Sequence, residues 1–172
     1  HWKGGDDYWQ MVDTVRGYLD GFQKLSEKTG VQTVVHNHSG LSMGLNSSSV
    51  MNLVKGFDPK HVGVFTDPGH LSICGEPIEL ALNIVKDYMS LLAFKDLMRQ
   101  AVIQGGKTTW RTKVVRLGHG FGDWTTLLTT LKTMKFDGVV SFHSEYSGEP
   151  VDTVIDLARA DVREIGRASC RE

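Results

Sequence analysis

The alternation of short apolar segments with amphipathic segments constrains the fold of this chain more than any other feature. Four short segments are apolar at nearly every position and are predicted as strands: 31–35, 61–65, 91–94 and 138–142. Segments with apolar residues at three- and four-residue spacing separate them and are predicted as helices: 7–28, 47–54, 77–89, 123–134 and 150–158. Continuous apolarity is expected of strands buried on both faces. The sequence therefore predicts one α/β domain in which helices cover a parallel sheet.

The stretch from 95 to 122 is polar and rich in glycine, and no regular element is predicted there. Gly105-Gly106 and Gly118-His119-Gly120 are typical of turns. A single Gly-x-Gly is only weak support for a phosphate-binding loop, so we assign no ligand to it.

Charge and hydropathy exclude several classes of protein. The chain has 19 Lys and Arg against 20 Asp and Glu, and a formal net charge of -1. Because no block of basic residues is present, we expect no nucleic-acid partner. No apolar run approaches the roughly 20 residues that cross a bilayer, and no signal peptide is visible, so we expect a cytoplasmic protein without a membrane partner. The chain begins at His1 and not at Met, so these expectations cover only the residues given. Cys74 and Cys170 are expected to be unpaired thiols.

The C-terminal segment is a separate case. Residues 164–172 can be encoded by DNA that contains the start of a common sequencing adapter. We therefore expect the native domain to occupy residues 1–163 and residues 164–172 to be a non-native tail.

Side chains that can bind metals or transfer protons follow all four predicted strands: His36 and His38, then Asp67 and His70, then Lys95, and last Glu145. Right-handed β-α-β connections bring the carboxyl ends of parallel strands to one edge of the sheet, so we expect these side chains to converge. A single Asp at a strand end is usually a turn or cap residue, and a single His is usually structural. The repetition at every strand end is what favours a functional site.

Imidazoles and carboxylates together suit a divalent ion such as Mn²⁺, Co²⁺, Mg²⁺ or Zn²⁺. Such an ion can polarise a substrate carbonyl and the hydroxyl beside it, and a neighbouring carboxylate or Lys can then carry a proton. The residues therefore predict a metal-dependent enzyme.

Five segments, in order along the chain, resemble the sugar phosphate isomerases and epimerases of the xylose isomerase-like barrel superfamily. They are VHNH at 35–38, HVGVFTDPGH at 61–70, FKD at 94–96, LGHGFGDW at 117–124 and FDGVVSFHSEY at 136–146. The resemblance implies a partial (β/α)8 TIM barrel, of which this chain supplies the last four strands and their helices. A complete barrel takes about 250 residues.

The resemblance also implies roles for individual residues. Such enzymes typically present Glu, Asp, His and Glu from their last four strands to one divalent ion. Carried over, Asp67 and Glu145 are expected metal ligands, and His36 stands where the family often has the first Glu. His70 and His38 are expected to contact the substrate. Lys95 and Glu145 are expected to act catalytically on it.

Two positions depart from the family pattern. His36 and His38, followed by Ser39-Gly40, resemble the inosose dehydratase branch. The family's His-x-Lys-Asp reads Ala93-Phe94-Lys95-Asp96 here, so a residue without a donor atom replaces an expected ligand. The substitutes that we consider are water and four imidazoles: His36, His38, His119 and His143. Period-two alternation places His143 on the same strand face as Glu145.

We therefore expect a divalent-metal-dependent isomerase or epimerase that acts on a sugar or sugar phosphate through an enediolate-type intermediate. An inosose-dehydratase-like lyase is the nearest alternative, in which a hydroxyl leaves the same intermediate. A carbohydrate-binding barrel without catalysis is a third hypothesis, favoured by Ala93. An abasic-site endonuclease of the superfamily is disfavoured because the chain lacks a basic DNA-binding face. The expected partner is a small sugar or sugar phosphate. A homo-oligomer is a possible assembly of the complete barrel.

Overall fold

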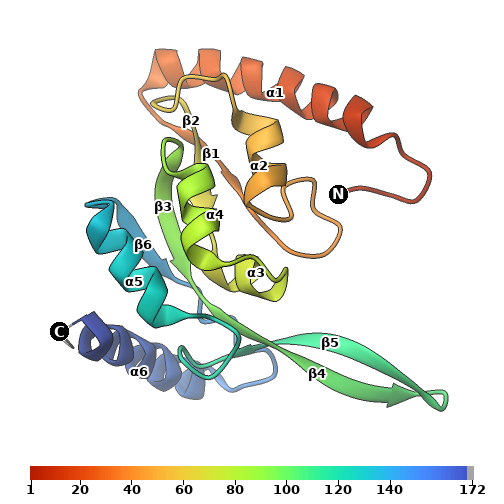
Figure 1. Ribbon diagram of the computed structural model, residues 1–172, viewed down its shortest axis with the longest axis vertical. Helices are drawn as coiled ribbons and strands as arrows, with labels where there is room; N and C mark the ends of the chain where they lie inside the picture. Colours follow the sequence, from red (N-terminus) through yellow and green to blue (C-terminus); the bar gives the residue numbers. More distant parts are fainter. Residues whose placement is uncertain (170–172) are drawn as a thin grey trace.

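A parallel sheet forms the centre of the protein in the computed structural model, which describes residues 1–169 and side chains as far as residue 166 (Figure 1). Its strands pair in the order β1-β2-β3-β6: β1 (Thr33–His36), β2 (Val62–Thr66), β3 (Met89–Phe94) and β6 (Val139–Phe142). Every pair is parallel. Within the described residues β1 and β6 are edges that do not meet, so the sheet is an open part of a barrel, as predicted.

The five predicted helices are confirmed. They are α1 (Tyr8–Thr29), α2 (Ser47–Val54), α4 (Ile78–Val85), α5 (Trp124–Thr133) and α6 (Val151–Ser169). The side chain of Asp7 caps the first turn of α1, and Gly30 ends that helix with φ 71°. A further helix, α3 (Pro68–Ile73), was not predicted because six residues are too few to show a helical period. Asp67 caps it and Pro68 is its first residue.

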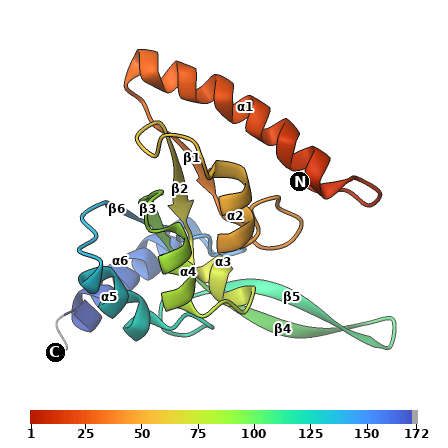
Figure 2. The same cartoon turned by 45° about the horizontal axis from the view of Figure 1, so that its top comes forward.

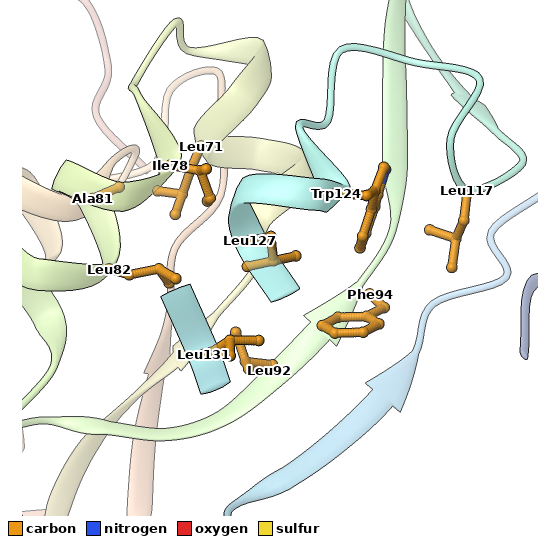
Figure 3. Packing of buried hydrophobic residues seen from close by; sticks show 10 residues of the cluster. All are labelled: Leu71, Ile78, Ala81, Leu82, Leu92, Phe94, Leu117, Trp124, Leu127 and Leu131. Atoms are coloured by element: carbon orange, nitrogen blue, oxygen red, sulfur yellow. The ribbon is translucent and has the colours of Figure 1, made fainter. Parts of the chain in front are cut away.

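The hydrophobic core lies between the sheet and the helices. Leu92 and Phe94 of β3 pack against apolar side chains of α3, α4 and α5 (Figure 3). A second cluster joins Val62 and Val64 of β2 to α1 and α2. Because side chains alternate along a strand, the residues between these positions face away from the helices. That opposite face is the inner face of a barrel, and the predicted site lies at the carboxyl ends of its strands.

The glycine-rich stretch contains a long antiparallel hairpin, which the sequence analysis missed. Strands β4 (Asp96–Gln104) and β5 (Lys107–Val115) are joined by Gly105-Gly106, and both glycines have positive φ. Two such residues between paired strands are a known hairpin signal. Figures 1 and 2 show the hairpin projecting away from the rest of the chain, and most of its side chains are exposed. Because its side chains are exposed, the hairpin lacks the apolar pattern on which strand prediction depends.

The C-terminal helix is longer than predicted. α6 continues past the expected domain end at residue 163 to Ser169, and Ile165 packs against the first core cluster. That residues 164–172 are non-native stays a prediction, and Cys170 lies outside the described residues. Cys74 is free, as expected. Among the described helices none is both long and apolar enough to cross a membrane.

Close packing between Gly69 of α3 and the Lys95 backbone leaves no room for a side chain at position 69. A Cβ at this position would lie 2.2 Å from the backbone oxygen of Lys95, a contact that only a backbone shift can relieve. We expect Gly69→Ala to lower the free energy of unfolding by about 1–3 kcal/mol. Gly17→Ala in α1 is the matched control, because a Cβ there meets nothing within 4 Å. It should be neutral or stabilising by up to about 1 kcal/mol in urea denaturation. Equal stability of the two variants would contradict the packing described.

Candidate active site

Asp67 lies at the centre of the side chains that converge at the carboxyl ends of the strands. It follows β2, and its side chain is fully buried. Asn37 holds its backbone on both sides: Asn37 Nδ2 donates to the Asp67 carbonyl at 3.1 Å, and the Asp67 amide donates to Asn37 Oδ1 at 2.7 Å. The Asp67 Oδ1 atom also accepts the His70 amide at 3.1 Å. Oδ1 of Asp67 therefore caps α3, and Oδ2 is not used in this cap.

Nitrogen atoms of three side chains lie around Oδ2 of Asp67. His36 Nε2 lies at 3.4 Å, Lys95 Nζ at 3.3 Å and His70 Nε2 at 3.8 Å. Burial alone would raise the pKa of Asp67, but the hydrogen bond from His36, the charge of Lys95 and the hydrogen bond from the His70 backbone amide outweigh it and lower this pKa below its ordinary value. Asp67 is therefore an anion at neutral pH, as a metal ligand must be.

His70 is held in a fixed orientation beside Asp67. Its Nδ1 hydrogen-bonds Ser39 Oγ at 2.9 Å, and the ring of His38 lies 3.8 Å from its own ring. Burial lowers the pKa of His70 to about 3, so the imidazole is neutral. Its Nε2 is buried and has no hydrogen-bond partner among the described residues. The two residues expected to contact the substrate, His38 and His70, are thus adjacent.

Lys95 and Glu145 form an ion pair at the same rim. Lys95 Nζ lies 3.2 Å from Glu145 Oε2, so one ammonium contacts both predicted carboxylates. The Lys95 side chain is 2% exposed, whereas that of Glu145 is 57% exposed. A buried cation thus holds a carboxylate that remains exposed to solvent.

Three residues place ligand atoms within 4.8 Å of one another: His36, Asp67 and His143. Two of them, His36 and Asp67, were predicted as ligands. Glu145, the third predicted ligand, is not in this group, and its carboxylate faces Lys95 and His143 instead. His143 was considered only as a substitute ligand. Two imidazoles and a carboxylate fit a divalent transition ion.

Asp96 and His119, which lie in the segments that resemble the family, are not part of this three-residue group. The carboxylate of Asp96 accepts the amides of Gly118 and Gly120 at 3.0 and 2.9 Å and the indole Nε1 of Trp124 at 2.9 Å. The Gly-x-Gly loop therefore binds a carboxylate of the chain itself. His119 in this loop is exposed and is not part of the three-residue group.

Cavities adjoin the cluster on two sides, and residues of the hairpin line both. One, of about 650 Å³, is lined by His38 and His70 together with Arg99 and Trp110. Another, of about 400 Å³, is lined by Glu145, Arg116 and Tyr146, among others. The hairpin thus forms a wall next to the side chains that converge at the strand ends.

The profile of the xylose isomerase-like TIM barrel family matches residues 3–164. The chain belongs to this family. An inosose dehydratase of Lacticaseibacillus casei is 29% identical over 98 residues, which are 55% of this chain and 30% of that protein. An uncharacterized protein of Methanocaldococcus jannaschii is 20% identical over 138 residues, or 79% of this chain and 44% of that protein.

Solved structures show the same fold. The IOLI protein with a bound zinc atom gives a TM-score of 0.75 at 17% identity, covering 99% of this chain and 61% of that one. A D-tagatose 3-epimerase-like protein gives 0.69 at 18% identity, covering 92% of this chain and 55% of that one. The chain thus spans less than two thirds of the relatives it matches. Several of the similar proteins are named as sugar epimerases or as dehydratases. This family was the one that the sequence resembled.

The neutral state of His70 generates a prediction about pH. Its folded pKa of about 3 lies below the value of about 6.5 in an unfolded chain. The unfolded state therefore binds more protons between these values, and stability falls as the pH drops below about 6.5. Between pH 7 and pH 5 in metal-free buffer, we expect the free energy of unfolding to fall about 1–2 kcal/mol more in the wild type than in His70→Gln. Urea titrations at both pH values measure this, and equal losses would show that His70 is not buried as neutral imidazole.

Proposed function

We propose that this protein is a divalent-metal-dependent isomerase or epimerase that acts on a sugar or sugar phosphate through an enediolate-type intermediate. The observation that carries the proposal is the placement of the buried cation Lys95 between Asp67 and Glu145. One carboxylate lies in the group that suits an ion, and the other is free to exchange a proton with the substrate. The family membership supports the fold and the general class of chemistry.

His36 and Asp67 would hold the ion, with His143 in reach of the same point. When bound, the ion supplies positive charge that polarises a carbonyl and the hydroxyl next to it, and thereby acidifies the carbon-bound proton. Asp67 fits this role because its pKa is lowered and its position is fixed by Asn37 and the cap of α3. The zinc atom in the similar IOLI structure is consistent with a metal at such a site.

Glu145 would take the proton from the carbon and return it. Its carboxylate is exposed to the cavity beside it and is oriented by Lys95 Nζ at 3.2 Å. The ammonium of Lys95 would also stabilise negative charge that develops on the substrate oxygen. His70 and His38, which line the larger cavity of about 650 Å³, would contact the hydroxyls of a substrate that is bound across the cluster between the two cavities.

A lyase is the second candidate function, because the same proton abstraction can be followed by departure of a hydroxyl. The similarity to an inosose dehydratase favours it. A carbohydrate-binding barrel without catalysis is the third, favoured by Ala93 at the position of an expected ligand. The three proposals differ in whether a substrate proton exchanges with solvent and in whether water is lost.

A solvent-exchange experiment tests the proposal. The protein would be incubated in D₂O with Mn²⁺ or Co²⁺ and a panel of ketohexoses, their phosphates and inosose, with products followed by NMR. We expect deuterium at the carbon next to the carbonyl, and a rate at least about 100-fold lower for Glu145→Gln, whereas the control Glu27→Gln stays within about twofold of wild type. Glu27 is an exposed acid in α1, away from the strand ends.

The other outcomes divide the alternatives. Loss of water from inosose without epimer or aldose products would support the lyase. Sugar binding without any exchange by the wild-type protein would support the binding barrel. Equal rates for the two glutamine variants would remove Glu145 from the mechanism.

A further inference from the structure

Strand β3 brings no metal-binding side chain to the inner face at the level of the cluster. Ala93 occupies that position, is fully buried and pairs with Ser141 of β6. The next residue along the strand, Phe94, packs with Phe142 on the helix side, at 5.8 Å between ring centroids. Ala93 therefore faces the inner side, and a methyl group is all that β3 presents there.

The ring of His143 extends across β3 at this place. The His143 amide donates to the Phe94 carbonyl at 3.0 Å, which continues the pairing one residue beyond β6. Its ring lies 5.3 Å from the ring of Phe65 on β2 and 5.8 Å from that of His36 on β1. Because β3 lies between β2 and β6, a side chain that reaches Phe65 from the end of β6 must pass over the inner face of β3. The small side chain of Ala93 leaves this space free.

The imidazole of His143 is also short of partners. Its Nδ1 is buried without a hydrogen bond within the described part of the chain, and the nearest carboxylate, Glu145 Oε1, is 3.5 Å away. A buried nitrogen without a partner costs free energy unless it binds something else. One ring nitrogen of His143 lies within 4.8 Å of a ring nitrogen of His36 and of a carboxylate oxygen of Asp67.

We infer that His143 supplies the metal ligand that β3 lacks, and that Ala93 is the complementary residue that gives its ring the necessary room. The site then consists of two imidazoles and one carboxylate, from the ends of β1, β2 and β6. Imidazole donors suit Zn²⁺, Co²⁺ and Fe²⁺, whereas Mg²⁺ prefers oxygen donors. The site therefore selects a borderline transition ion over Mg²⁺. This inference rests on the metal site of the proposed function but not on its reaction.

Titration calorimetry with Zn²⁺ and Co²⁺ in the absence of substrate tests the ligand. We expect His143→Ala to weaken binding of both ions by at least about 100-fold, since it removes one of three protein ligands. His119→Ala is the control, an exposed histidine outside the group, and should leave affinity unchanged. Wild-type protein should bind Co²⁺ at least about 100-fold more tightly than Mg²⁺. Unchanged affinity in His143→Ala, or equal affinity for Mg²⁺, would overturn the inference.

An exchange variant tests the complementarity of the two positions. Ala93→His combined with His143→Ala moves the imidazole to the neighbouring strand, and we expect it to recover most of the lost Co²⁺ affinity. Ala93→His alone should lower the unfolding temperature, because two rings then compete for one space. If Ala93→His alone is as stable as wild type, the two side chains do not compete for the same space. Circular dichroism on each variant confirms that lost affinity is not lost folding.

The two proposals fail in different ways. If Co²⁺ binding depends on His143 but no substrate proton exchanges, His143 is a metal ligand and the proposed isomerase function is wrong. If His143→Ala keeps both the exchange activity and the metal affinity, the isomerase function stands and His143 is not a metal ligand.

Discussion

The buried carboxylate of Asp67 is the constraint on which the rest of the site depends. An ionised group without solvent is costly unless charges and hydrogen-bond donors surround it. Here His36, Lys95 and the amide of His70 supply them from β1, from the end of β3 and from α3. The close approach of Gly69 to the Lys95 backbone is a consequence, because α3 must lie against the end of β3 for these contacts to form. The sheet brings the strand ends to one rim, and Asp67 fixes their side chains relative to one another.

The sequence predicted the parts of the fold that depend on hydrophobic pattern. The strands are apolar at consecutive positions and the longer helices carry an apolar stripe, so both were found. The hairpin was missed because exposure removes that pattern, although Gly105-Gly106 was a usable signal for its turn. α3 was missed because it is short, although an Asp followed by Pro is a helix start.

The convergence of the site could be predicted from topology alone, because parallel strands end on one side. What could not be predicted is which side chain reaches which neighbour. Asn37, to which the sequence pattern assigned no role, hydrogen-bonds the Asp67 backbone twice. The sequence pattern places His143 and Glu145 on one strand face. Only the structure shows that Glu145 forms an ion pair with Lys95 and that the His143 ring lies near that of His36. Asp96, part of a family motif, accepts hydrogen bonds from Gly118 and Trp124 and so anchors the loop after the hairpin.

We propose that the side chains around Asp67 hold a divalent ion. Anomalous diffraction from crystals grown with Zn²⁺ or Co²⁺, collected at the absorption edge of each metal, would locate this ion. We expect one strong peak about 2.0–2.2 Å from a nitrogen of His36 and a carboxylate oxygen of Asp67. A crystal that contains the metal elsewhere, with no peak at Asp67 and the Lys95 contact intact, would contradict it.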